Sequence, residues 1–91
     1  MTIQIRYAAS VFTQAGWRSV IITALATPSP TGKMARVTEV TAIDGQTPTT
    51  GMSRTGAKRQ AYNGKSIAQR EVGANKRISA CEIVEDEREA A

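Results

Sequence analysis

The sequence predicts an α+β protein, a small and mainly antiparallel sheet with a central hairpin and one or two short helices. The hairpin is predicted by the stretch 17–43, in which residues 19–27 form the most continuously apolar run of the chain. A Pro-Ser-Pro-Thr-Gly segment follows at residues 28–32, and a Thr- and Val-rich run extends from there to Ile43. Two β-branched runs on either side of a Pro/Gly turn are typical of an antiparallel hairpin.

The length and composition limit what the fold can contain. The 91 residues make one domain, which we expect over residues 1–84, followed by an acidic C-terminal tail at residues 85–91. A domain of this size buries roughly two-thirds of its unfolded surface. Four residues are aromatic, so the core must consist mainly of Val, Ile, Leu and Ala. We therefore expect a binding surface rather than a deep, enclosed active site.

The sequence pattern in the first half of the chain predicts strands. Between residues 3 and 11 one face carries Ile3, Ile5, Tyr7, Ala9 and Val11, and the other carries Gln4, Arg6, Ala8 and Ser10. A turn is expected at residues 14–16. The run 20–26 is apolar on both faces, which predicts a central strand covered on both sides.

Residues 34–43 form a less regular segment. Val37 and Val40 recur at a helical spacing, but the segment is rich in β-branched residues, which favour strands. A strand with one bulge would place both valines on the same side. Asp44-Gly45 predicts a turn, and residues 46–52 a polar loop.

The second half admits alternatives. Residues 53–62 fit either a helix or an edge strand, and we favour a strand followed by a helix. Ser66 and Gln69 form a capping-box pattern that predicts a helix starting at Ile67, with Gly73 placed to end it. Residues 78–84 predict a last strand.

Charge is segregated along the chain. Residues 53–77 carry seven basic and one acidic side chain, whereas residues 78–91 carry one basic and five acidic ones. Cations interleaved with small polar residues are typical of contacts to nucleic-acid phosphates, and Tyr62 is a candidate for stacking on an exposed base. The candidate binding residues are Arg54, Lys58, Arg59, Tyr62, Lys65, Arg70, Lys76 and Arg77. The alternative interpretation of the same segment is a solvated helix or edge-strand face.

Several chemistries are excluded or disfavoured. The chain has no histidine and a single cysteine, Cys81, so it lacks the commonest general base, a disulfide and a thiolate zinc site. Gly64-Lys65-Ser66 resembles the end of a phosphate-binding loop, but Arg59 stands where that loop requires glycine. The acidic tail lacks the ligand spacing of a calcium loop. We expect no enzyme activity, no cofactor and no metal site.

The cellular location is also constrained. Arg18 and the apolar run after it imitate a signal peptide, but the segment before them is too long and too polar for one. No run approaches the roughly 18 apolar residues that a membrane helix requires. We expect a cytoplasmic protein without a membrane partner.

These observations lead to three functional hypotheses. The first is a non-enzymatic protein that binds nucleic acid or a host nucleoprotein through residues 54–77. In size, basic charge and lack of catalytic motifs, the chain resembles small accessory proteins of phages and mobile elements such as anti-CRISPRs. That resemblance implies the second hypothesis, a protein-binding inhibitor that blocks a host complex. The third is a self-assembling structural subunit, consistent with a homo-oligomer.

Overall fold

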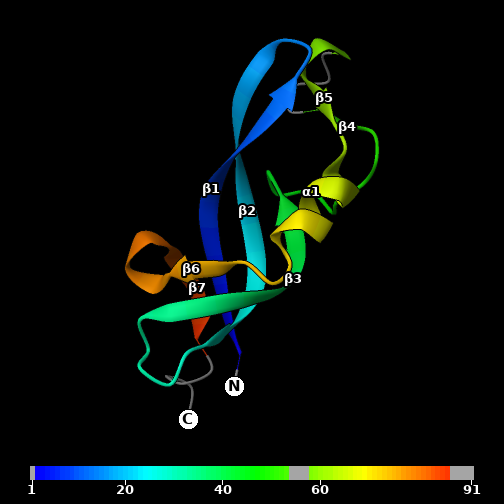
Figure 1. The fold of residues 1–91 in the computed structure, drawn as a ribbon. Coiled ribbons are helices and arrows are strands. Elements are labelled where there is room, and N and C mark those ends of the chain that lie inside the picture. Colours follow the sequence, from blue (N-terminus) through cyan, green and yellow to red (C-terminus); the bar gives the residue numbers. More distant parts are fainter. Residues whose placement is uncertain (1, 54–57, 87–91) are drawn as a thin grey trace.

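The computed structural model describes residues 2–53 and 58–86, and these form mostly antiparallel sheet with one short α-helix (Figure 1). The protein is therefore largely a β fold, and the α+β description holds only roughly. The elements in chain order are β1 (Ile3–Thr13), β2 (Gly16–Pro28), β3 (Met34–Ile43), β4 (Met52–Ser53), the 3-10 turn η1 (Lys58–Gln60), β5 (Ala61–Tyr62), α1 (Gly64–Glu71), β6 (Asn75–Arg77), the 3-10 turn η2 (Ile78–Ala80) and β7 (Glu82–Asp86).

The predicted hairpin lies at the centre of the larger sheet. This sheet has five strands in the order β6-β3-β2-β1-β7, and β4 pairs separately with β5. The antiparallel pairing of β2 with β3 confirms the hairpin around residues 28–32. Its register shifts twice, after Thr23 and after Leu25, so β3 carries two irregularities where one bulge was expected. Val37 and Val40 are both buried, as the bulge predicted.

The alternation of β1 is confirmed by burial. Ile3, Ile5, Tyr7 and Val11 are buried, and Ala9 is packed against the same core. The facing residues of β2 and β3 complete this interior, which includes Ile22 and Ile43, both fully buried. Most of the core is thus built from aliphatic side chains on one face of the sheet, as the composition predicted, and Tyr7, Met52 and Tyr62 add to it.

The second face of β2 is less covered than the sequence suggested. Thr23 is buried, but Ile21 is 40% exposed and Leu25 is half-buried. The reason is that helix α1 and strands β4 and β5 all lie on the core side of the sheet, so nothing among the described elements forms a second layer behind β2. The expectation of a strand covered on both sides is therefore wrong for this face.

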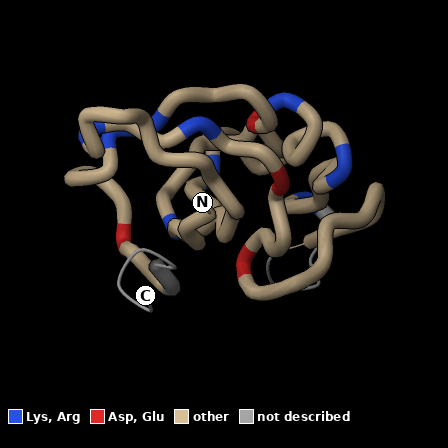
Figure 2. The backbone as a smooth tube through the Cα atoms, turned by 90° about the horizontal axis from the view of Figure 1, so that it is seen from below, with Lys and Arg blue, Asp and Glu red and all other residues tan. Residues whose placement is uncertain are grey.

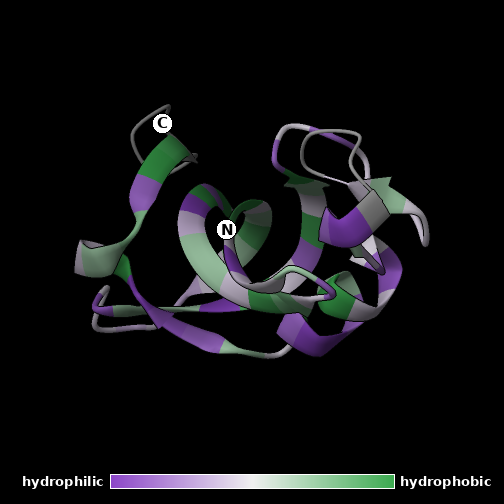
Figure 3. Ribbon diagram, turned by 90° about the horizontal axis from the view of Figure 1, so that it is seen from above, coloured by the Kyte–Doolittle hydropathy of each residue, from purple (hydrophilic) through white to green (hydrophobic). Residues whose placement is uncertain are grey.

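The sheet is curled because its two edges are joined by a short link. In a flat five-stranded sheet the edge strands would lie about 19 Å apart, since neighbouring strands are about 4.8 Å apart. β6 and β7 are the two edges, yet only η2 and Cys81 connect Arg77 to Glu82. A 3-10 turn rises only about 2 Å per residue, so this link is too short for a flat sheet. Figure 3 looks down into the resulting curl, with β1 starting near its middle.

A tight turn follows β3. Asp44 and Gly45 both have positive φ, at 50° and 77°, and Ile43 pairs with Gln46 across them. A two-residue turn of this kind needs φ above zero at both central positions, which Asp and Gly tolerate well. The turn predicted at Asp44-Gly45 is therefore confirmed.

The helix of the second half starts earlier than predicted. α1 begins at Gly64, and its N-cap is Asn63, whose side-chain oxygen accepts a hydrogen bond from the Ser66 amide at 3.0 Å. Asparagine at this position satisfies one of the free amides of the first turn. The capping box at Ser66 is thus not the helix start, and Ser66 lies inside the first turn. The helix ends before Gly73, whose φ of +89° confirms its predicted role.

The remaining segments differ from the prediction in length. The strand expected over residues 53–62 is reduced to β4 and β5 at its ends, and residues 54–57 lie outside the described part of the chain. The strand expected over residues 78–84 begins instead with η2, and β7 extends through Asp86. Glu85 and Asp86, which the sequence analysis assigned to the tail, therefore belong to the sheet, and residues 87–91 lie outside the described residues.

The packing around Gly64 gives a test of the fold. A Cβ at this position would collide with the Met52 sulfur and lie 2.8 Å from the Thr49 carbonyl oxygen. We expect Gly64→Ala to lower the free energy of unfolding in urea by about 2 kcal/mol, because overpacking forces the backbone to shift. The control is Gly51→Ala, where a Cβ would meet no atom within 4 Å. Equal stability of both variants would contradict the packing described here.

Candidate nucleic-acid interface

The predicted basic segment does not form one continuous surface. Lys58 and Arg59 lie in η1, and the Arg59 side chain is exposed while its carbonyl accepts a hydrogen bond from the Ala15 amide at 2.8 Å. Lys65 and Arg70 are exposed on α1. They are five positions apart, which separates them by about 140° around the helix axis. Arg54 lies outside the described residues.

Tyr62 does not have the position that stacking on a base requires. Its side chain is only 8% exposed, and its hydroxyl lies 3.4 Å from a carboxylate oxygen of Asp44. The ring belongs to the hydrophobic core, next to Met52 in the β4–β5 pair. The expectation that Tyr62 presents its ring to a ligand is therefore wrong, because the short β5 strand turns it inward.

Lys76 is engaged inside the protein. Because it lies opposite the buried Ala35 in the β3–β6 pair, its side chain points into the curl. Its Nζ atom lies 3.4 Å from Glu71 Oε1 and 4.6 Å from the centre of the Tyr7 ring. The Tyr7 hydroxyl donates a hydrogen bond to the same Glu71 oxygen at 2.8 Å. Lys76 thus joins β6 to α1 and β1, and it is not part of an exposed phosphate-binding surface.

The same contacts shift the titration of Tyr7. Burial, the hydrogen bond to Glu71 and the negative charge of Glu71 together raise the pKa of Tyr7 well above its ordinary value of 10.0. The neutral phenol is favoured because a phenolate would lose water contact and face a carboxylate. This cluster of three side chains is therefore a structural connection between β1, α1 and β6.

A second group of cations does gather on one surface. In the β3–β6 pair, Arg36 lies opposite Asn75 and Met34 lies opposite Arg77, so the two arginines are diagonal neighbours. Diagonal neighbours on one face are about 7 to 8 Å apart, and both arginines are exposed. Lys33, also exposed, is held next to them because its carbonyl accepts a hydrogen bond from the Ile78 amide at 2.9 Å. We call Lys33, Arg36 and Arg77 the basic edge.

The surface around the basic edge is hollowed. An open groove of about 710 Å³ is lined by the cations Lys33 and Arg77, by the hydroxyl-bearing Thr31 and Ser79, and by Gly32, Met34 and Ile78. A shallower groove of about 440 Å³ lies beside Arg36. Among the residues that the structure describes, no member of the basic edge forms a salt bridge. Figure 2 shows most Lys and Arg positions in the upper half of the view, on the side formed by β3, β6 and α1.

The sequence analysis found only one of these three cations. It assigned Arg77 to the binding segment but left Lys33 and Arg36 in the first half of the chain. The signal that links them is the antiparallel pairing of β6 with the start of β3, and β6 was not predicted. Exposed cations cluster here across a long sequence separation, so a count along the chain cannot detect them.

Two exposed aromatic side chains lie at the far end of the hairpin formed by β1 and β2. Phe12 and Trp17 face each other across the strands, with ring centres 5.4 Å apart in an edge-to-face arrangement. Each is 69% exposed. The alternation of β1 gives the signal that the sequence analysis left unused, since Phe12 continues the outward face of Gln4, Arg6 and Ser10. We call Phe12 and Trp17 the aromatic tip.

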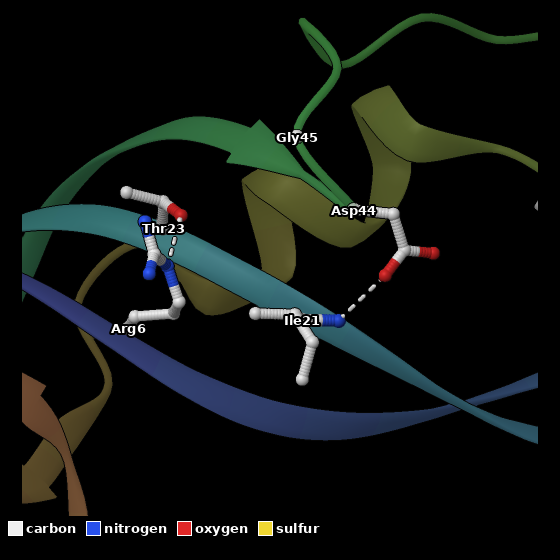
Figure 4. A pocket seen from close by; sticks show the side chains of 5 residues that line it. All are labelled: Arg6, Ile21, Thr23, Asp44 and Gly45. Atoms are coloured by element: carbon white, nitrogen blue, oxygen red, sulfur yellow. Dashed lines mark hydrogen bonds between the residues drawn. The ribbon is translucent and has the colours of Figure 1, made fainter.

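A third surface feature is a polar depression behind the sheet, with a volume of about 430 Å³ (Figure 4). Its Asp44 carboxylate accepts a hydrogen bond from the Ile21 amide at 2.9 Å, and Arg6 lies 3.4 Å from the Thr23 hydroxyl and 3.3 Å from Glu82. These groups fasten the turn after β3 to β2 and strand β1 to β7. None of them is arranged as a nucleophile beside a base.

The surroundings of Cys81 are those of a packed structural residue. Its thiol lies 3.4 Å from the Arg77 carbonyl oxygen, and burial raises its pKa, an effect that nearby Lys76 partly opposes. A thiol with a raised pKa is a poor nucleophile at neutral pH.

Within residues 2–53 and 58–86 no group of three or more Cys, Asp or Glu residues could hold a metal ion. The α1 helix is too short and too polar to cross a membrane, and no other described helix could do so.

The fold and these surfaces define a small β protein with a curled sheet, a basic edge and an aromatic tip. Comparisons with protein-family models, with curated proteins and with solved structures found no match. Functional inference therefore depends on the geometry described above.

The Tyr7 cluster predicts a pH dependence of stability. The folded state keeps the phenolic proton above pH 10, where the unfolded chain releases it, so the stabilisation from Tyr7 is complete below about pH 10 and is lost as pH rises. We expect Tyr7→Phe to lower the free energy of unfolding by about 1 to 2 kcal/mol at neutral pH. Urea denaturation at several pH values should show this difference shrinking above about pH 10. A difference that stays constant or widens there would contradict the assignment.

Proposed function

We propose that this protein is a small, non-enzymatic, cytoplasmic binding protein that engages nucleic acid, alone or within a nucleoprotein complex, mainly through phosphate contacts. The observation that carries the proposal is the pairing of β6 with β3, which makes Arg36 and Arg77 diagonal neighbours next to Lys33, with Lys33 and Arg77 lining an open groove. Lys65 and Arg70, exposed on two sides of α1, add further positive charge outside the basic edge.

The chemistry of the basic edge supports this proposal. Arginine presents several N–H donors in a planar fork that matches phosphate oxygens, and lysine adds a compact charge. A cation that already has a carboxylate partner, such as Arg6 with Glu82 or Lys76 with Glu71, must give that partner up before it can bind a phosphate. Within the described part of the chain, the three cations of the basic edge have no carboxylate partner to give up before they bind a phosphate.

The proposal predicts a specific salt dependence. Each phosphate contact to a duplex steepens the fall of log affinity with log salt by about 0.9, because bound counterions are released. The triple substitution of Lys33, Arg36 and Arg77 to Gln should therefore flatten the slope by about 2 to 3, as measured by fluorescence anisotropy with a labelled duplex. Arg6→Gln is the control, because Arg6 is already paired with Glu82 and lies on β1, two strands away from β3, so this change should leave the slope unchanged.

A second triple variant compares the interface predicted from the sequence with the one built from the structure. Neutralising Arg59, Lys65 and Arg70 should flatten the slope less than neutralising the basic edge, because these three cations are dispersed over η1 and two sides of α1. The opposite order would move the interface to α1. No binding of the wild-type protein to duplex or single strands at low salt would overturn the proposal.

Two further measurements on the wild-type protein and the triple variants distinguish the two alternative functions. A protein-binding inhibitor would capture one stoichiometric protein partner and keep it in both triple variants. A self-assembling subunit would show concentration-dependent mass in light scattering, with no effect of nucleic acid.

A further inference from the structure

The aromatic tip is the most exposed apolar feature among the described residues. Phe12 and Trp17 are each 69% exposed, whereas the other large exposed hydrophobic side chains are at most 48% exposed. Large aromatic side chains left in water usually mark a contact site, because they contribute strongly to binding when they are covered. The pair is also held in place, since the two residues are directly opposed in an antiparallel ladder and their rings contact each other edge to face.

The tip is covered on its other face. Val11, Thr13 and Val20 point to the core side of the same hairpin and are buried. The Ala15 amide at the turn donates a hydrogen bond to the Arg59 carbonyl, which ties η1 to that side. Figure 1 shows the β1–β2 hairpin extending to one end of the molecule, with β5 beside it. Both aromatic rings therefore lie on the outward face of a braced hairpin.

The charge around the tip favours an anionic ligand. The sequence contains no Asp or Glu in residues 1–38 or 45–70, which include the tip and the η1 segment that contacts it. Arg18 follows Trp17 in β2 and therefore points to the opposite face of the hairpin, the side on which η1 carries Arg59, and both arginines are exposed. Exposed aromatic rings at a hairpin end that also carries arginine and no acidic residue are a combination used to bind single-stranded nucleic acid, in which the bases stack and the phosphates are neutralised.

We propose that Trp17 and Phe12 form a stacking platform for an unpaired base of a single-stranded nucleic acid, with Arg18 and Arg59, on the other face of the same hairpin end, positioned for the phosphates of the strand where it continues around that end. This inference rests on the proposed function and narrows its ligand to single strands or to exposed unpaired regions. Base pairs inside a duplex have both faces occupied by their neighbours, so apart from the two ends of a duplex a ring on the protein surface stacks on an unpaired base. The aromatic tip thus takes the role that the sequence analysis assigned to the buried Tyr62.

Trp17 is the only tryptophan of the chain, so its fluorescence reports directly on this contact. Titration of the full-length protein at low salt with a thymidine oligonucleotide of about 20 nucleotides should change the Trp17 emission. A duplex of the same length should bind without that change. The single strand should also bind more tightly than the duplex.

The double variant Phe12→Leu and Trp17→Leu removes the platform but keeps apolar side chains at both positions. We expect anisotropy with a labelled oligonucleotide to show an affinity for the single strand about tenfold lower, and an unchanged affinity for the duplex. Val84→Ala is the control, since Val84 is also exposed, at 40%, but lies in β7. Circular dichroism checks that both variants are folded.

The outcomes separate this inference from the proposed function. Equal affinity for single and double strands with an unchanged Trp17 emission would overturn the stacking platform and leave phosphate binding intact. A double variant that loses self-association in light scattering, with unchanged affinity for both nucleic acids, would assign the tip to contacts between copies and would also overturn it. No binding to either nucleic acid would remove the proposed function as well.

Discussion

The short link between β6 and β7 is the constraint on which the rest of the structure depends. These two strands are the opposite edges of one sheet, and four residues connect them. The sheet must curl for this connection to close, and the curl creates a single interior for the aliphatic core. The pairing of β6 with β3 then decides which way the side chains of β6 face, because Lys76 lies opposite the buried Ala35 and neighbouring residues of a strand point to opposite sides. Lys76 therefore turns inward while Arg77 faces outward.

The inward lysine is tolerated because its partners are supplied by two other elements. Glu71 comes from the end of α1 and Tyr7 from the distant β1, so three separate elements meet around one carboxylate oxygen. The charged group of Lys76 remains partly accessible, at 31% for the side chain, which limits the cost of desolvation. The cluster fixes β6 against the sheet. In doing so it also fixes the arginines on the outward face of the same strand pair.

The sequence predicted the strands of the first half well because local patterns dominate there. The alternation from Ile3 to Val11 and the Asp44-Gly45 turn each depend on neighbouring residues, and both were confirmed. Helix α1 was predicted, but its start was missed, since the capping-box pattern of Ser66 and Gln69 predicts a later start than the one that the Asn63 cap sets. β6 has three residues and no apolar alternation, so its existence follows only from pairing with β3.

The difference between local patterns and pairing of distant strands also explains why the candidate site was predicted only in part. Counting charges along the chain identified residues 54–77 as basic, but it could not reveal that Lys76 is paired or that Tyr62 is buried. These facts depend on which strands become neighbours. The outward position of Phe12, in contrast, was already implied by the period-two pattern of β1. The side-chain pattern within one strand or helix can thus be predicted from the sequence, whereas a site formed by several elements cannot.

The elongated shape has a consequence for how a flexible ligand would be held. The molecule measures 44 × 19 × 18 Å, and Figure 1 shows the β1–β2 hairpin end and β6 well separated along its length. Under the proposed function, a polymer long enough to bridge both regions gains the second contact as an intramolecular event, at high effective concentration. A fragment too short to bridge them gains only one contact. The affinity for a nucleic acid would then rise abruptly once its chain is long enough to reach both regions.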